Sequence, residues 1–314
     1  MRKINKALVI IDHSFWLYYT IFGSISEFQR KASNEASHWL KPAEETDQEN
    51  LPDILGCETY KRILKKFVMK RCETIDWQLR GHFQDELDAV DKIDIVFAMD
   101  DFTSNNFRKK LFPQYKAQRK LLPKQFDMFK VRNYVVDVIF KELELEEKYG
   151  YKFISVPGAE ADDIIATIVN KCSDDYMLKV LFASDHDFIQ LEGVKQLNLF
   201  GKEIECRLGE TKLTPQEYLL SKIILGDTAD NIPKVFSNIG PKRVINLIRD
   251  KDKLKSMLKE NQAAAYQFKL NKQLIAFSEI PEELVKKITE EVNKVLYSND
   301  VLNEEGSFGN LEWL

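Results

Sequence analysis

Short apolar runs alternate with amphipathic segments over the first two thirds of the 314-residue chain. Four runs are rich in Val, Ile, Leu and Phe, at residues 7–12, 95–100, 151–156 and 180–185. Such runs are typical of strands that are buried on both faces. Three segments with a helical period stand between them, at residues 60–90, 132–147 and 160–172. This alternation predicts an α/β fold with a mostly parallel central sheet flanked by helices.

The strand pattern fades after about residue 210. Helices are predicted there at residues 215–225, 241–249, 252–260 and 281–297. We therefore expect an α/β domain at residues 1–210 and a smaller helical C-terminal region at residues 211–314. Residues 24–58 are polar and weakly periodic, and we interpret them as an irregular insertion without an assigned role. No run of about 18 apolar residues is present, so we expect no membrane span.

Three of the predicted strands end in an aspartate, namely Asp12, Asp100 and Asp185. Sites in open parallel sheets form at the carboxyl ends of the strands. Carboxylates gathered at one edge would repel one another unless a cation neutralises them. Further acids follow nearby, so that the candidate set is Asp12, Asp100, Glu160, Asp162, Asp163, Asp185, Asp187, Asp227 and Asp230.

This acidic set predicts a metal site. Each acid alone has an ordinary explanation, because aspartates often serve as turn residues or helix caps. The combination instead favours hard divalent ions, above all Mg²⁺, which prefer oxygen ligands. Two such ions about 4 Å apart suit the attack of water on a phosphodiester. We therefore expect two Mg²⁺ ions, which Mn²⁺ could replace.

The stretch at residues 102–132 is basic and aromatic, with nine basic residues, one acid and six aromatic residues. Cations interleaved with aromatic rings suit a single nucleic-acid strand, because phosphates need charge and unstacked bases need flat partners. The alternative is a solvated basic helix whose phenylalanines face the core. The net charge of −4 for the whole chain does not exclude nucleic acid, since only the local field meets a ligand.

A second candidate for phosphate binding is the sequence Gly240-Pro241-Lys242-Arg243. It is typical of a tight turn that opens a helix, whose backbone N–H groups can hold a phosphate. Taken alone, it is more often only a helix start. The four cysteines have no Cys-x-x-Cys spacing, which indicates reduced thiols in a cytoplasmic protein.

Several motifs together resemble one family. They are Phe107-Arg-Lys-Lys-Leu-Phe-Pro-Gln-Tyr-Lys-Ala-Gln-Arg119, Gly158-Ala-Glu-Ala-Asp-Asp163, Ala183-Ser-Asp-His-Asp-Phe188, and Gly226-Asp-Thr-Ala-Asp-Asn-Ile-Pro233 followed by Ile239-Gly-Pro-Lys242. In this order they resemble the 5′-nucleases of the flap-endonuclease type. That family includes the N-terminal exonuclease domain of bacterial DNA polymerase I and the phage enzymes called RNase H, which are the most similar in length.

The resemblance implies a role for each matched residue. It implies a first metal held by Asp12, Asp100, Glu160, Asp162 and Asp185, with Asp163 shared or behind them, and a second held by Asp187, Asp227 and Asp230. Catalysis would depend on Asp12, Asp100, Asp162, Asp185, Arg108 and Lys109. A helical arch would contact a 5′ strand through Arg108, Lys109, Tyr115, Lys116, Arg119 and Lys120. A helix–turn–helix element within residues 226–250 would hold duplex phosphates through Gly240, Lys242 and Arg243, together with K⁺.

The implied activity is hydrolysis at 5′ ends, 5′ flaps and RNA–DNA primers during DNA replication, in a phage and its host cytoplasm. The substrates would be branched or nicked DNA and RNA–DNA hybrids, bound by a monomer. Residues 305–314 either dock on a sliding clamp or single-strand-binding protein, or pack on their own domain. His13 and Ala229 depart from the residues common in the family.

Two other functions remain as alternatives. A Mg²⁺-dependent phosphatase or phosphotransferase would use a strand-end aspartate as nucleophile. Such an enzyme usually needs a second aspartate two residues after the first, where this chain has Ser14. A non-catalytic module that binds branched DNA should have lost several of the carboxylates, and none is lost.

Overall fold

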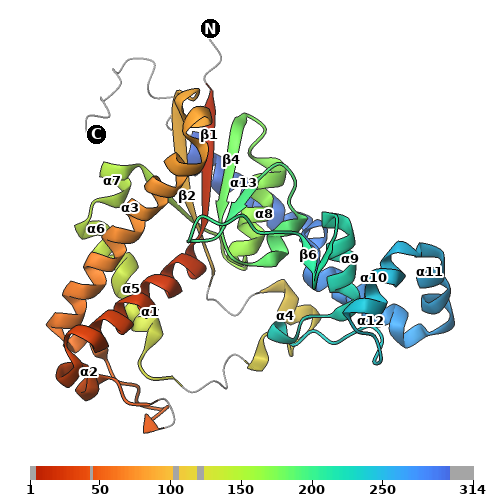
Figure 1. The fold of residues 1–314 in the computed structure, drawn as a ribbon, viewed down its shortest axis with the longest axis horizontal. Coiled ribbons are helices and arrows are strands. Elements are labelled where there is room, and N and C mark those ends of the chain that lie inside the picture. The colour runs from red at the N-terminus through yellow and green to blue at the C-terminus, as the bar shows by residue number, and fades with distance from the viewer. Residues whose placement is uncertain (1–4, 43–44, 102–105, 119–123, 298–314) are drawn as a thin grey trace.

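The fold is described from a computed structural model, in which residues 5–42, 45–101, 106–118 and 124–297 are placed (Figure 1). Its centre is a five-stranded parallel sheet with the order β3-β2-β1-β4-β5. The strands are β1 (Lys6–Asp12), β2 (Lys92–Met99), β3 (Tyr151–Ser155), β4 (Tyr176–Phe182) and β5 (Lys195–Leu197). The central strand β1 therefore lies between β2 and β4.

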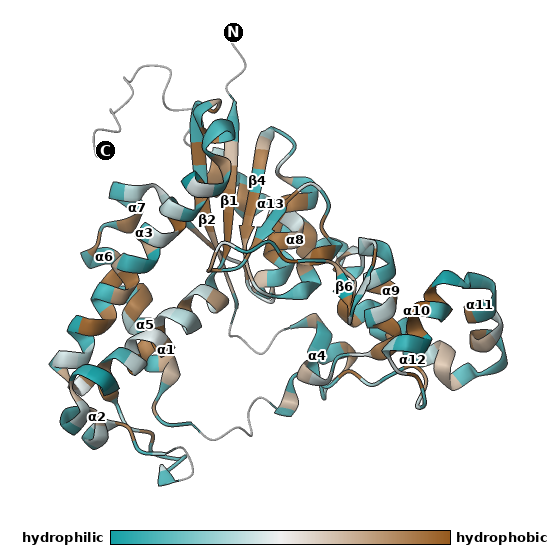
Figure 2. Ribbon diagram, viewed as in Figure 1, coloured by the Kyte–Doolittle hydropathy of each residue, from teal (hydrophilic) through white to brown (hydrophobic). Residues whose placement is uncertain are grey.

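Helices cover both faces of this sheet. One face carries α1 (His13–Lys31) and α3 (Glu58–Asp88), and the other carries α8 (Ala161–Lys171) and α13 (Glu282–Tyr297). Successive residues of β1 point to opposite faces. Val9 packs with α1 and α3, whereas Leu8 and Ile10 pack with α8 and α13, and all three are fully buried. Figure 2 shows hydrophobic residues along the central strands and a mixture of hydrophobic and hydrophilic residues along the helices.

The remaining elements connect these layers or form the helical region. Between β1 and β3 they are α2 (Ser33–Trp39), η2 (Ile54–Gly56), α4 (Phe107–Leu111), α5 (Met128–Tyr134), η4 (Val135–Ile139), α6 (Phe140–Glu142) and α7 (Leu145–Tyr149). After β4 they are η5 (His186–Gln190), β6 (Arg207–Leu208), β7 (Thr211–Lys212), α9 (Pro215–Leu225), η6 (Thr228–Asp230), α10 (Pro241–Arg249), α11 (Lys251–Glu260), α12 (Gln262–Ile275) and η7 (Phe277–Glu279).

The strand order creates a crevice at one edge of the sheet. From β1 the chain moves outward to β2 and β3, and then returns to β4 on the other side of β1. The connections after β1 and β4 therefore run in opposite directions, and a crevice opens between the carboxyl ends of these strands. The segments that follow β1, β2 and β4 all begin at this edge.

The predicted α/β fold with a mostly parallel sheet is confirmed. The interpretation of residues 24–58 as an irregular insertion was wrong in its first part, because residues 24–31 complete α1 and residues 33–39 form α2. Ser24, Ile25 and Phe28 are buried in α1. The small polar residues Ser24 and Ser26, which are weak helix formers, obscured the helical period there.

The sequence pattern also missed β5, the β6–β7 hairpin and α12. The last helix of the described chain, α13, leaves the helical region and packs against α8 and the sheet. Residues 282–297 therefore contribute to the core of the α/β part. None of the helices in the described residues is long and apolar enough to cross a bilayer.

Candidate metal centre

Three strand-end aspartates lie at the crevice edge, and the backbone holds each of them. Asp12 ends β1 and caps α1, where its Oδ1 accepts the Phe15 N–H at 3.2 Å. Asp100 follows β2 and accepts the Ala161 N–H at 2.8 Å and the hydroxyl of Ser14. The exposed Asp185 follows β4 and caps η5. Sheet topology thus places these acids together, as the sequence predicts.

Four carboxylates near this edge affect one another's pKa. Burial, together with the nearby carboxylates of Asp100 and Asp185, raises the pKa of Asp12 to about 7. Burial also raises the pKa of Asp162 well above its usual range, and Asp185 and Asp12 add to this rise against the opposing charge of Lys116. A carboxylate raises the pKa of another only at short range. Asp12, Asp100, Asp162 and Asp185 therefore form one acidic group.

Asp163 pairs with Arg108. Its Oδ1 accepts a hydrogen bond from Arg108 Nη2 at 2.8 Å, and its Oδ2 accepts one from Nη1 at 3.0 Å. Its Oδ2 also accepts the Glu160 N–H at 3.0 Å. The side chain of Asp163 is 0% exposed and that of Arg108 is 3% exposed. This geometry disagrees with a direct metal-binding role for Asp163 and with a phosphate-binding role for Arg108, because the two charges are buried and already paired with each other.

Glu160 is held by residues of the basic stretch. Lys116 Nζ lies 2.6 Å from its Oε1, and the Tyr115 hydroxyl donates to its Oε2 at 3.0 Å. Burial would raise the pKa of Glu160, but Lys116 and Arg108 hold it well below its usual range. Lys116 Nζ also lies 4.0 Å from Asp230 Oδ2. Tyr115 is only 4% exposed, so its ring packs inside the protein and does not offer a stacking surface.

The other residues predicted for the arch have different settings. Lys109 lies on α4 with its side chain exposed. Arg119 and Lys120 lie outside the described residues. In the helical region, α10 begins at Pro241 after Gly240, and Lys242 and Arg243 are exposed in its first turn. The helix–turn–helix assignment stays a prediction.

Lys222 is a site residue that the sequence analysis missed. Its ammonium group on α9 forms an ion pair with Asp187 and lies 3.0 Å from Asp227 Oδ2. Burial would lower the pKa of Lys222, but Asp187 raises it well above its usual range. Burial raises the pKa of Asp187 to about 6, although Lys222 opposes this rise. A lone lysine within the apolar run Tyr218-Leu-Leu-Ser-Lys-Ile-Ile-Leu225 was the available signal.

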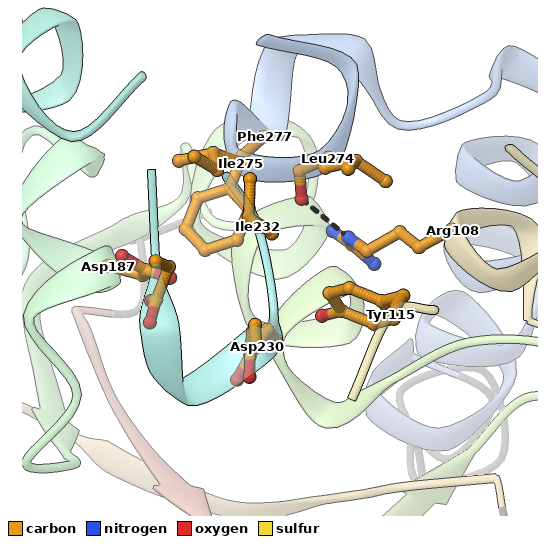
Figure 3. A pocket seen from close by; sticks show the side chains of 10 residues that line it. Arg108, Tyr115, Asp187, Asp230, Ile232, Leu274, Ile275 and Phe277 are labelled. Atoms are coloured by element: carbon orange, nitrogen blue, oxygen red, sulfur yellow. Dashed lines mark hydrogen bonds between the residues drawn. The ribbon is translucent and has the colours of Figure 1, made fainter. Parts of the chain in front are cut away.

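A pocket joins the acids of the sheet edge to those of the helical region (Figure 3). It is lined by Arg108, Tyr115, Asp162, Asp187, Asp227, Asp230, Ile232, Leu274, Ile275 and Phe277. Figure 3 shows Asp187 on one side of the pocket and Arg108 and Tyr115 on the other, with Asp230 below and the apolar side chains above. Acids that were predicted to bind two different metal ions therefore line the same pocket.

The donor chemistry of this centre fits a hard divalent ion, because every candidate ligand is a carboxylate and no thiol or imidazole takes part. In the part of the chain that the structure describes, no three acidic, histidine or cysteine side chains already converge as a metal site. Glu160, Asp187 and Asp227 instead face Lys116 or Lys222. A divalent ion that binds these acids must therefore compete with an ammonium group.

His13 follows Asp12 but does not belong to the centre. It is fully buried among Trp16, Phe97 and Phe140. Burial, together with the charge of Arg132, lowers its pKa to about 3, so the ring is neutral at physiological pH. Its role is to pack beneath the crevice.

Asp12→Asn is expected to stabilise the protein in EDTA at about pH 8, by about 2–4 kcal/mol. The folded state holds the Asp12 proton up to a pKa of about 7, whereas the usual value is 3.8. The preference of the folded state for a protonated Asp12 therefore stabilises wild type at low pH, and this stabilisation is lost as pH rises from about 4 to about 7. Asparagine keeps the cap on α1 and carries no charge.

Urea denaturation of both proteins across this pH range measures the effect. The exposed Asp85→Asn on α3 is the matched control and should differ little from wild type at any pH. The gain in stability of Asp12→Asn over wild type should be larger at about pH 8 than at about pH 4. An equal gain at the two pH values would contradict the burial argument.

Comparison with known proteins identifies relatives over most of the chain. The family described as "5′-3′ exonuclease, N-terminal resolvase-like domain" matches residues 81–218. A 5′-3′ exonuclease of Buchnera aphidicola from Schizaphis graminum is 31% identical over 262 residues, which are 81% of this chain and 73% of the relative. One from the Acyrthosiphon pisum strain is 28% identical over 199 residues, which are 58% of this chain and 65% of the relative.

A solved structure shares the fold. The phage T5 5′-exonuclease aligns with 92% of this chain and 99% of its own, with a TM-score of 0.56 and 17% identity. This likeness supports the arrangement of the sheet and its flanking helices. The sequence similarity to the Buchnera enzyme goes further, because it extends over most of both proteins. The chain therefore belongs to the 5′-3′ exonuclease and flap endonuclease family.

Proposed function

We propose that this protein is a divalent-metal-dependent nuclease that hydrolyses phosphodiester bonds at 5′ ends, 5′ flaps and RNA–DNA primers. The observation that carries the proposal is the group formed by Asp12, Asp100, Asp162 and Asp185, in which burial and the neighbouring carboxylates raise the pKa of Asp12 and Asp162. Such crowding is unfavourable for folding and is typical of functional sites. Among the solved relatives, T5 5′-exonuclease has divalent zinc ions bound, and T5 flap endonuclease is in complex with DNA and metal ions.

The ligands can be assigned to two ions. Asp12, Asp100, Glu160, Asp162 and Asp185 would hold one Mg²⁺ or Mn²⁺ ion, and Asp187, Asp227 and Asp230 the other. When bound, such ions activate the attacking water and stabilise the leaving oxygen. The chain itself orients the ligands: Ser14 and the Ala161 N–H fix Asp100, and the turn at η5 fixes Asp185. Ser14 thereby has a positioning role where the phosphatase alternative needs an acid.

Nucleic-acid binding would use the cations of the basic stretch. The exposed Lys109 would contact phosphates near the reacting bond, and Lys116 would join it by exchanging its ion pair with Glu160 for a phosphate. The predicted phosphate contacts of Arg119 and Lys120 concern residues outside the described part of the chain. Lys242 and Arg243 at the start of α10 would hold the duplex, with K⁺ nearby. A place in phage replication fits the substrate class. The proposed docking of residues 305–314 on a clamp or single-strand-binding protein concerns a segment outside the described residues.

Cleavage of a 5′-labelled flap in Mg²⁺, and its loss in EDTA, is the expected result. Nicked duplex and an RNA–DNA hybrid tested beside the flap would define substrate preference. A substrate labelled at its 3′ end tests the polarity, because cutting from the 5′ side must shorten it progressively or release the flap. Cleavage that persists in EDTA, or failure to cut any of these substrates in Mg²⁺ or Mn²⁺, would refute the proposal.

A further inference from the structure

The guanidinium of Arg108 joins three segments that are far apart in the sequence. Its Nε donates to the Leu274 carbonyl at 2.9 Å, in the last turn of α12. Its Nη1 and Nη2 donate to the two oxygens of Asp163 on α8. Nη1 also reaches Glu160 Oε2 at 3.1 Å. Arg108 therefore connects α4 to both the first turn of α8 and the end of α12.

This arrangement uses a property that only arginine has. The planar group donates in a fixed fork, so it can bind both oxygens of one carboxylate and still direct Nε elsewhere. A lysine would supply the charge but not these simultaneous directions. The pair with Asp163 is fully buried, and loss of either partner would leave an uncompensated charge inside the protein.

The contacts of the following residues depend on where α4 is held. Lys116 has a positive φ of 57°, which is unusual for a residue other than glycine. Its N–H donates to the Asp230 carbonyl at 3.0 Å, while its ammonium reaches Glu160. Gln118 Nε2 donates to the Thr228 carbonyl at 2.8 Å. Such an uncommon backbone conformation persists only where surrounding contacts impose it.

We propose that Arg108 is a positioning residue, which anchors residues 106–118 to α8 and α12 and thereby fixes Glu160 and Lys116 at the acidic centre. It would act through these two residues and would not touch the nucleic acid. This inference rests on the proposed nuclease function for its catalytic consequence. Its structural consequence, the anchoring of residues 106–118, can be measured on the protein without substrate.

The test compares four variants with wild type. Arg108→Met removes the fork, and Arg108→Lys keeps only the charge. The double variant Arg108→Met/Asp163→Asn removes both buried charges and keeps an acceptor for the Glu160 N–H. Arg80→Met is the matched control, because Arg80 forms an exposed pair with Asp76 on α3 at 3.2 Å.

Three measurements are made on each variant. Amide hydrogen exchange without substrate reports whether residues 106–118 are anchored. Steady-state cleavage of a 5′ flap at saturating Mg²⁺ separates kcat from KM. Unfolding by urea shows which variants keep the stability of wild type, and the double variant is included because it should recover stability that Arg108→Met loses.

We expect exchange in residues 106–118 to become at least about tenfold faster in all three Arg108 variants. The kcat should fall by about 100-fold even in the double variant, because misplacement by about 1 Å has an effect of this size. Arg80→Met should match wild type. Unchanged exchange in the Arg108 variants, or a wild-type kcat in the double variant, would overturn the proposal. Failure of the wild type to cut would instead refute the nuclease function and leave the exchange result valid.

Discussion

Asp185→Asn is expected to lower the cleavage rate of a 5′ flap by at least about 1,000-fold, because metal activation contributes several kcal/mol to such reactions. Asp185 lies exposed at the carboxyl end of β4, where its charge acts on Asp12 and Asp162. Asparagine can still accept the Asp187 N–H that the aspartate accepts at 2.8 Å. The turn should therefore keep its shape while the centre loses one charged ligand.

Single-turnover cleavage in Mg²⁺ and flap binding in Ca²⁺ would measure the two effects separately. Binding should change little, because many phosphate contacts outside the acidic centre contribute to it. Asp174→Asn, which alters an exposed aspartate after α8, should cut at the wild-type rate. An Asp185→Asn protein that cuts as fast as this control would remove Asp185 from the proposed first metal site.

Gly226→Ala is expected to destabilise the protein by at least about 3 kcal/mol, through backbone strain and steric overlap together. Gly226 has φ 67° and ψ −171°, a combination that is essentially restricted to glycine. A Cβ atom there would lie 2.4 Å from the Ile232 carbonyl oxygen and 2.5 Å from that of Pro233. Both are backbone atoms, so the loop that carries Asp227 would have to move.

Urea denaturation measures this loss, and the matched control is Gly209→Ala in the β6–β7 turn. Gly209 also has a positive φ, of 62°, but a Cβ atom there meets nothing within 4 Å. It should lose only about 1 kcal/mol, which is the cost of the left-handed conformation alone. Equal losses in the two variants would mean that steric overlap with Ile232 and Pro233 adds nothing to the cost of the left-handed conformation.

The sheet edge was predictable from the sequence because its signals are local. A buried strand that ends in aspartate identifies both an element and its carboxyl end, and parallel topology then brings Asp12, Asp100 and Asp185 together. The motif around Glu160 and Asp162 follows β3, the neighbour of β2. Both facts could be inferred without knowing any contact between distant parts of the chain.

The burial of Arg108 and the position of Lys222 could not be inferred in this way. Arg108 stands in a strongly basic stretch, which favoured a solvent-exposed interpretation. Its partner Leu274 belongs to α12, a helix that the sequence pattern missed because it buries few side chains, among them the polar Asn271. Lys222 faces Asp187 only because α9 packs against η5. These assignments depend on tertiary contacts, which the local spacing of apolar residues cannot reveal.

The return of α13 to the sheet has a consequence for synthesis on the ribosome. Ile288, Val292 and Leu296 belong to the core that covers Leu8 and Ile10 of β1, although β1 is translated long before α13. A nascent chain that lacks residues 282–297 would therefore expose part of this apolar sheet face. Such a chain should be a substrate for chaperones and should acquire protease resistance only after α13 has emerged.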